Sequence, residues 1–210
     1  MQTIATPHGF GVASAWVQRW SNLVSPGGHV LDVGCGHGRH VRWFAARNHP
    51  VMGIDRNPAA LASLTDLTSM HAGNPGVQTV LADIENAPWP LISRQVNDPE
   101  CSQTLQQFDA VIVTNYLWRP LLPTLISSLA PGGVLVYETF AAGNETVGKP
   151  GRPDFLLQPG ELLTVCAGLR VVAFEDGFID HPARFVQRIA AVRLEPGSAA
   201  QPIRLPIGTG

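Results

Sequence analysis

Short runs of apolar residues recur along the first two thirds of the chain. Each run is rich in Val, Ile and Leu and is typical of a strand covered on both faces of a sheet. We predict strands over residues 30–34, 51–55, 77–83, 108–115 and 133–140. These five runs would form the core of one sheet.

The segments between these runs have helical spacing. We predict helices over residues 39–47, 58–70 and 119–129. The second opens with proline at the first helical position, and its leucines then recur three residues apart. The third ends at a Pro-Gly-Gly sequence. Alternation of strand and helix predicts a parallel sheet with right-handed crossovers.

The pattern changes in the last third and at the N-terminus. Residues 161–169 have helical spacing, and the β-rich runs 169–180 and 184–194 are close enough to pair as antiparallel strands. An antiparallel edge is a common addition to a parallel sheet. Trp16 and Trp20, four residues apart, indicate the packed face of an N-terminal helix, although such a helix can also cap a pocket.

Two segments interrupt the alternation of strand and helix. The polar residues 93–107 are interpreted as a surface loop. Residues 141–154 are rich in Gly and Pro and follow a strand end, which makes them a candidate lid over a site. We expect a single domain over residues 1–195 and a loosely ordered tail over 196–210.

Composition excludes some partners and compartments. The chain has 14 Lys and Arg against 16 Asp and Glu, which does not favour nucleic acid as a partner. No apolar run reaches the ~20 residues of a membrane helix, and the first residues do not resemble a signal peptide. Cys35, Cys101 and Cys166 are too far apart for a disulfide framework or a CxxC metal site. We therefore expect a cytoplasmic protein without a metal.

A glycine-rich turn is the sharpest chemical signal. The sequence LDVGCGHG leads from a buried strand into a helix and places Gly34, Gly36 and Gly38 two residues apart. Glycines allow backbone to pass close to a ligand. The spacing differs from the G-x-G-x-x-G of dinucleotide sites. Asp32 precedes the turn, where its carboxylate can bind loop amides or a ligand ammonium group.

Two further carboxylates end the next two strands. Asp55 can accept hydrogen bonds from both hydroxyls of a ribose, and Asp83 can accept one from an adenine amino group, with Ile84 against the ring. The alternative for either residue is a helix-capping or loop carboxylate. Ligands of open α/β sheets bind at this edge, where the strands end.

The series LDVGCGHG, GID, LADIE, FDAVIVTNYL and LAPGGVLVYETF resembles the successive motifs of class I S-adenosylmethionine-dependent methyltransferases, over roughly residues 26–140. The resemblance implies an α/β fold with a Rossmann-like, doubly wound and mostly parallel seven-stranded sheet, in the order 3-2-1-4-5-7-6, with one antiparallel strand near the edge. It implies S-adenosylmethionine as cofactor. The expected cofactor-binding residues are Asp32, Gly34, Cys35, Gly36, Gly38, Asp55, Arg56, Asp83, Ile84 and Asn115.

A second likeness concerns the segments NYLWRPLL and ETFAAGNE to GKPGRPDFLLQPGELL. They resemble a bacterial branch near the tellurite-resistance and small-molecule methyltransferases, which implies a small substrate. Trp118 stands where that branch is expected to have His, so no acid–base role is expected there.

Methyl transfer from a sulfonium can depend mainly on positioning, which is worth ~7–11 kcal/mol. A base is needed only if the nucleophile loses a proton. We take Asn115 and Tyr116 as candidates to orient the nucleophile, and Glu138 as the candidate base. Trp118 and Arg119 are further candidates for the substrate side. A salt-bridged Glu138 and a purely pocket-lining Tyr116 are the alternatives.

Three other functions stay open. A non-catalytic cofactor-binding protein would keep the cofactor pocket without a usable substrate cavity. A nicotinamide-dependent oxidoreductase would need a later third glycine and a motif such as Tyr-x-x-x-Lys, and neither tyrosine has a Lys four residues on. A nucleic-acid methyltransferase is disfavoured because residues 115–118 differ from an Asn-Pro-Pro-Tyr signature. The substrate, the methylated atom and the choice between monomer and homodimer are left open by the sequence.

Overall fold

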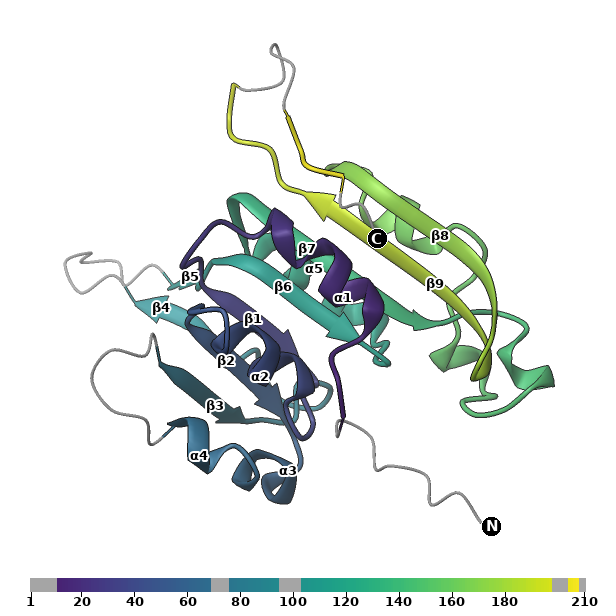
Figure 1. Cartoon of the computed structure of the whole chain (residues 1–210), viewed down its shortest axis with the longest axis horizontal. Helices are drawn as coiled ribbons and strands as arrows, with labels where there is room; N and C mark the ends of the chain where they lie inside the picture. Colours follow the sequence, from purple (N-terminus) through teal and green to yellow (C-terminus); the bar gives the residue numbers. More distant parts are fainter. Residues whose placement is uncertain (1–10, 69–75, 95–102, 198–203, 208–210) are drawn as a thin grey trace.

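A mixed sheet of seven strands forms the centre of the computed structural model, which describes residues 11–68, 76–94, 103–197 and 204–207 (Figure 1). The strand order is β3-β2-β1-β6-β7-β9-β8. The strands are β1 (Val30–Val33), β2 (Val51–Asp55), β3 (Val77–Leu81), β6 (Phe108–Thr114), β7 (Leu129–Phe140), β8 (Arg170–Asp180) and β9 (Ala183–Val192). Only β9 runs antiparallel to its neighbours. Numbered within this sheet alone, the order is the expected 3-2-1-4-5-7-6, so the predicted fold class is confirmed.

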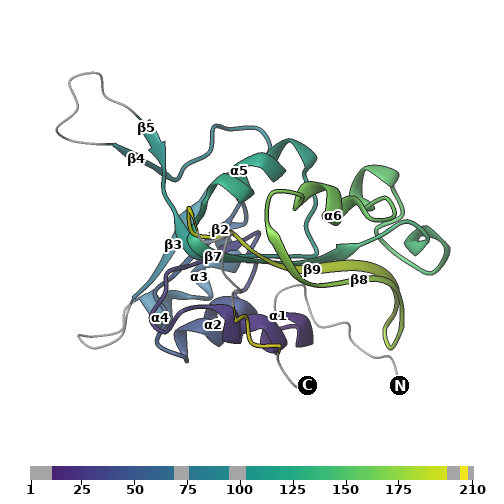
Figure 2. The same ribbon diagram turned by 90° about the horizontal axis from the view of Figure 1, so that it is seen from above.

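Helices cover both faces of the sheet (Figure 2). One face carries α1 (Ala15–Trp20), α2 (Arg39–Ala45), α3 (Pro58–Ala62) and α4 (Thr65–Thr68), and the other carries α5 (Leu122–Ser127) and α6 (Glu161–Val165). Short 3-10 turns complete the list: η1 (Ser21–Leu23), η2 (Arg119–Leu121), η3 (Asn144–Thr146) and η4 (Pro153–Phe155). Each face therefore has its own apolar core.

Helix α1 packs through the tryptophans that the sequence singled out. Ser14 caps the helix by accepting a hydrogen bond from the Val17 amide. The rings of Trp16 and Trp20 meet edge to face at 5.6 Å, and both side chains are buried. Trp16 also donates to the Ile189 carbonyl of β9. This confirms the packed face predicted for this helix.

The helix predicted over residues 58–70 is divided into α3 and α4. Asn57 caps α3, and Pro58 occupies its first position as expected. The helix stops at Ser63, whose hydroxyl donates to the Ala60 carbonyl and whose amide donates to the same carbonyl. Such side-chain bonds to the backbone compete with continued helix. Met70 lies outside the described residues.

The helix predicted over residues 119–129 ends earlier, and the strand after it begins earlier. Helix α5 ends at Ser127, and β7 already begins at Leu129. The Pro-Gly-Gly sequence therefore lies inside β7, which pairs with β6 across a register shift between Phe108 and Ala110.

The loop predicted over residues 93–107 contains strand residues at both ends, which is a correction. Strands β4 (Ile92–Arg94) and β5 (Gln103–Leu105) pair antiparallel and project beside the main sheet (Figure 1).

Cys101, the first ten residues and part of the predicted 196–210 tail lie outside the described residues. Among the described helices, none has the length and apolar character to span a membrane.

Candidate functional site

The glycine-rich turn joins β1 to α2 in a left-handed backbone conformation. The φ angles of Gly34, Gly36 and Gly38 are 66°, 53° and 74°. A Cβ atom on Gly38 would overlap a methyl carbon of Leu64, so the turn packs directly on the residue that precedes α4. These φ values and this close approach explain why glycine occupies the turn.

Asp55 links the end of β2 to the glycine turn. Its Oδ2 atom accepts a 2.7 Å hydrogen bond from the Gly36 amide, and its Oδ1 atom accepts a 2.8 Å bond from the Asn57 amide. A carboxylate can accept more than two hydrogen bonds, so both oxygens keep acceptor capacity. The structure therefore brings together two features that the sequence placed at neighbouring strand ends.

Asp32 is a buried carboxylate beneath the turn, with 1% of its surface exposed. Its Oδ2 atom has no hydrogen-bond partner among the described residues. The nearest ring nitrogen of His40 is 3.9 Å away. Burial raises the pKa of Asp32 to about 7 and lowers the pKa of His40 to about 3. Buried polar atoms are nearly always hydrogen-bonded, so this oxygen is a candidate to accept a hydrogen bond from a ligand.

The imidazole of His40 is held by the backbone before α1. The Ser14 amide donates to its Nε2 atom at 3.2 Å. Because neutral imidazole carries one proton, this bond assigns the proton to Nδ1, on the side of Asp32. His40 is thus a buried structural residue.

Asp83 follows β3 and closes a short turn. It accepts hydrogen bonds from the amides of Glu85 and Asn86 at 3.1 and 3.3 Å, and from the Asn86 side chain at 2.9 Å. The Asn86 side chain and these amides hold the pKa of Asp83 below its usual value. The geometry fits the loop-carboxylate alternative, while Asp83 and Ile84 also face a cavity.

Two adjoining hollows open at the edge where the parallel strands end. The larger has a volume of about 570 Å³, and the smaller about 300 Å³. They share Gly34, Asp55, Arg56 and Asn115. The larger volume is in the range of small-molecule sites. It is lined by Gly34, Asp55, Arg56, Ala82, Asp83, Ile84, Glu85, Asn115, Tyr116, Leu117, Thr139, Phe140, Lys149, Pro150 and Phe155.

Most of the predicted cofactor residues line these hollows. Cys35 and Gly36 line the smaller one, whereas Asp32 and Gly38 are not among the lining residues of either. The Sγ atom of Cys35 is buried against Gly53. Burial raises the pKa of the Cys35 thiol, which agrees with a packing role for its side chain.

Asn115 and Tyr116 directly follow the end of β6 at Thr114. Asn115 has a φ of 55°, an unusual conformation for a residue other than glycine, and lines both hollows. Such backbone conformations concentrate at functional sites. The Tyr116 hydroxyl is buried close to Glu85. Burial and the nearby Glu85 raise the pKa of Tyr116, which favours the protonated hydroxyl.

Glu138 does not line either hollow. Its side chain is buried, and its Oε2 atom accepts a 3.2 Å hydrogen bond from Arg188. Its Oε1 atom lies 3.9 Å from Arg184. The geometry is that of the salt-bridged carboxylate considered as an alternative, and it offers no basis for a general base at this position.

The segment after β7 lines part of the larger hollow through Lys149 and Pro150, which lie in the candidate lid 141–154, and through Phe155 directly after it. Arg119 holds this segment in place. Its guanidinium makes two bonds to Glu161, at 2.7 and 2.9 Å, and donates to the carbonyls of Asp154 and Leu156. Arg119 therefore anchors the loop instead of facing the cavity.

None of the five tryptophans, all of which lie in the described ranges, is among the residues that line the two hollows. Trp118 packs against the apolar cluster below α5. Aromatic contact comes instead from Tyr116, Phe140 and Phe155. The Gly- and Pro-rich composition of residues 141–154 was the only sequence signal for this wall.

Residues 30–133 match a family described as a methyltransferase domain. The chain is 28% identical over 188 residues to a tRNA U34 carboxymethyltransferase of Klebsiella pneumoniae, a match that covers 82% of this chain and 52% of the relative. It is 29% identical over 123 residues to a malonyl-[acyl-carrier protein] O-methyltransferase of Serratia marcescens, covering 57% and 41%. The chain thus spans about half the length of these curated relatives.

Among solved structures, TehB from Haemophilus influenzae matches with a TM-score of 0.65 and 18% identity, covering 89% of this chain and 64% of that one. At this identity the likeness concerns the fold. The sheet order is that of a class I Rossmann-like α/β fold, and the glycine turn lies beside Asp55. With the domain match, they place the chain in the S-adenosylmethionine-dependent methyltransferase family.

Proposed function

We propose that this protein transfers a methyl group from S-adenosylmethionine to a small molecule, with the two bound side by side in the adjoining hollows. One arrangement carries the proposal: the glycine turn and Asp55 border both hollows, and the unpartnered Asp32 carboxylate is buried beneath the turn. These features suit the cofactor, and the part of the larger hollow lined by Thr139, Phe140 and Phe155 offers room for a substrate.

The residues present fit the cofactor. The Oδ2 atom of Asp32 lacks a hydrogen-bond partner among the described residues, and the ammonium group of the cofactor would supply one. In this assignment the turn from Gly34 to Gly38 contacts the amino-acid moiety and Asp55 accepts from the ribose hydroxyls. Asp83 and Ile84 face the adenine, while Cys35, Arg56 and Asn115 complete the site. When bound, the cofactor supplies a methyl group already activated by its sulfonium.

The protein's part in the reaction is then mainly positioning. Asn115 and Tyr116 directly follow β6 and line the larger hollow, where they can donate hydrogen bonds to a nucleophile. Phe140 and Phe155 give the same cavity an apolar surface. Such positioning can account for ~7–11 kcal/mol of barrier reduction. The Glu138 carboxylate is engaged by arginines, so we assign no proton transfer to it.

A small substrate is favoured over tRNA by two observations. The loop that Arg119 anchors contributes part of the wall of a cavity whose volume suits a small molecule. The chain carries 14 basic and 16 acidic residues, whereas nucleic-acid binding depends on an excess of basic side chains.

Methyl transfer from isotope-labelled S-adenosylmethionine tests this function. The purified protein is incubated with a low-molecular-weight metabolite extract, or with total tRNA, and the label is followed into each fraction. We expect label in small products and S-adenosylhomocysteine formation in step with it. Label in tRNA would contradict the small-molecule substrate. Cofactor binding without transfer to either fraction would instead support the non-catalytic alternative.

A further inference from the structure

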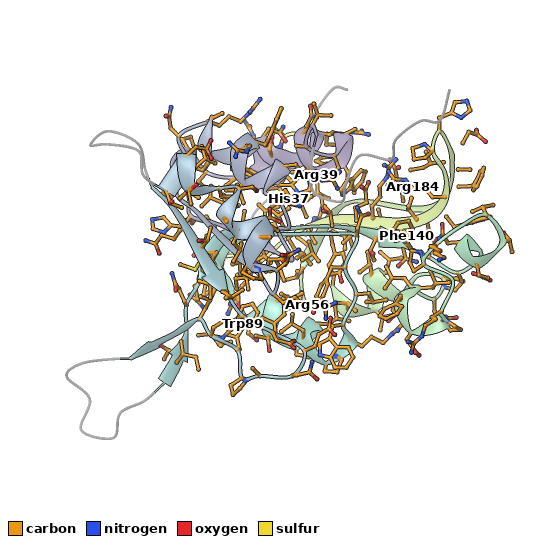
Figure 3. The ribbon with its side chains drawn as sticks, turned by 90° about the horizontal axis from the view of Figure 1, so that it is seen from below. His37, Arg39, Arg56, Trp89, Phe140 and Arg184 are labelled. Atoms are coloured by element: carbon orange, nitrogen blue, oxygen red, sulfur yellow. The ribbon has the colours of Figure 1, made fainter. Side chains whose placement is uncertain are left out.

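An arginine cluster lies next to the cavity on the face of the sheet that α1 and α2 cover. It consists of Arg39 from α2 and of Arg184 and Arg188 from β9, and all three lie near Glu138. Figure 3 shows the positions of Arg39 and Arg184. Side chains two residues apart on a strand share a face. Arg188 lies opposite Glu138, and Val186 opposite Phe140. Arg184 is therefore on the same face as Phe140, which lines the larger hollow.

The three arginines of this cluster differ in how fully their N–H groups are hydrogen-bonded. Arg188 donates to Glu138 at 3.2 Å and to Glu175 at 2.7 Å. Arg184 has only a 3.9 Å approach to Glu138, and its Nε atom is buried without a hydrogen-bond partner among the described residues. Arg39 makes one long contact, 3.4 Å to the Thr114 hydroxyl. A buried guanidinium donor without an acceptor is costly, so an incoming acceptor would be favoured.

The charge around Glu138 is also unbalanced. Arg39, Arg184 and Arg188 face Glu138, and Arg188 shares the more exposed Glu175 with Arg19. Asp32 is the remaining acidic neighbour of Arg39, and burial disfavours its charged form. The cluster therefore has an excess of positive charge. It meets the smaller hollow at Arg39, which lines that hollow beside Thr114.

We propose that Arg39 and Arg184 bind a carboxylate group of the substrate, so that the protein methylates a small carboxylic acid. This inference rests on the proposed methyltransferase function and adds the chemical class of the substrate. Guanidinium groups match the planar geometry of a carboxylate and form charge-assisted hydrogen bonds with it. The unpartnered Arg184 Nε atom is one donor for this contact, and the Arg39 guanidinium supplies others.

Calorimetric titration of the protein, loaded with S-adenosylhomocysteine, tests the proposal with malonate as probe and malonamide as its uncharged counterpart. We expect malonate, but not malonamide, to bind saturably. Arg184→Gln should weaken malonate binding by about tenfold or more, the loss of a charge-assisted contact. Arg184→Lys, which keeps the charge, should lose less. Arg170→Gln, at the exposed start of β8, is the control with the same charge change.

The proposal is overturned if malonate and malonamide bind equally, or if Arg184→Gln binds malonate as tightly as the wild type does.

The carboxylate of the cofactor itself is the competing ligand for these arginines. Methylthioadenosine lacks that carboxylate, so its affinity is compared with that of S-adenosylhomocysteine in wild type and Arg184→Gln. If Arg184→Gln weakens the binding of S-adenosylhomocysteine but not that of methylthioadenosine, the arginines bind the carboxylate of the cofactor and the proposal is overturned. Failure of wild type to bind either nucleoside would contradict the proposed function, whereas malonate binding to the unloaded protein still reports on the arginines.

Discussion

Asp32 combines complete burial, an unpartnered oxygen and a position beneath the glycine turn. Its pKa is raised to about 7 by burial, with Arg39 opposing and Asp55 reinforcing the shift, while His40 stays neutral. The ionised carboxylate is the form that attracts an ammonium group. The affinity for S-adenosylhomocysteine should therefore rise as the pH rises through about 7.

Dissociation constants measured from pH 6 to 8 test this expectation. Asp32→Asn should bind more weakly at pH 8 and show a flatter pH dependence, because the amide does not ionise. Asp66→Asn, at an exposed carboxylate of α4, should behave as wild type. An equally steep profile in Asp32→Asn would show that another group is responsible.

Gly38 combines a left-handed φ with contact to Leu64, and Gly27 has a similar φ of 71° with no atom near its missing Cβ. Both Gly38→Ala and Gly27→Ala should lose ~1–2 kcal/mol from the left-handed backbone. Gly38→Ala should lose a further ~1–3 kcal/mol because its methyl overlaps Leu64. The free energies of urea unfolding of the two variants measure this difference. Equal values would contradict the close packing of the turn.

At the residue scale, the sequence predicts contacts between neighbouring strand ends better than contacts between distant strands. The bond from Gly36 to Asp55 follows from the parallel order of β1 and β2. The engagement of Glu138 by Arg188 depends on the register of β7 with β9, some fifty positions further along the chain. The local sequence pattern does not determine that register, so the sequence alone could not show that Glu138 pairs with Arg188.

At the element scale, the loop over the cavity depends on Arg119. Removing this side chain in Arg119→Ala should speed hydrogen exchange at the backbone of η4 and of Leu157, whose amide bonds to Phe140. Arg119→Lys should restore little, because lysine lacks the planar fork that spans Glu161 and the loop carbonyls.

Arg152→Ala is the control within the same loop. Its pair with Asp154 is largely exposed, at 72% and 71% of the side-chain surfaces, so its loss should change exchange only slightly. Hydrogen exchange monitored by mass spectrometry compares the variants. Equal protection in Arg119→Ala and Arg152→Ala would show that Arg119 does not anchor the loop.

Elements with a strong apolar pattern were predicted closely, and those defined by local polar bonds were not. The strand over residues 51–55 has the predicted bounds because β2 is covered on both faces. The division between α3 and α4 is set by the Ser63 side chain, and the β4–β5 hairpin has no apolar alternation to reveal it. Helix propensity and hydrophobic periodicity do not reveal such competition between side-chain and backbone hydrogen bonds.

At the scale of the whole molecule, the sheet brings the ends of β1, β2, β3, β6 and β7 to one edge, and the two hollows lie there. The parallel sheet was predictable from the alternation of strand and helix, whereas the strand order came from the resemblance to class I methyltransferases. The shape of the cavity was not predictable, because its wall combines strand ends with the loop after β7.

The central claim is that this edge binds S-adenosylmethionine, and calorimetric titration with S-adenosylhomocysteine tests it most directly. We predict micromolar binding by the wild type and its loss in Asp55→Ala, which removes both the ribose acceptor and the bond to the Gly36 amide. The surface variant Asp66→Ala should bind as wild type does. Absence of binding by the folded wild type, or unchanged affinity in Asp55→Ala, would contradict the account.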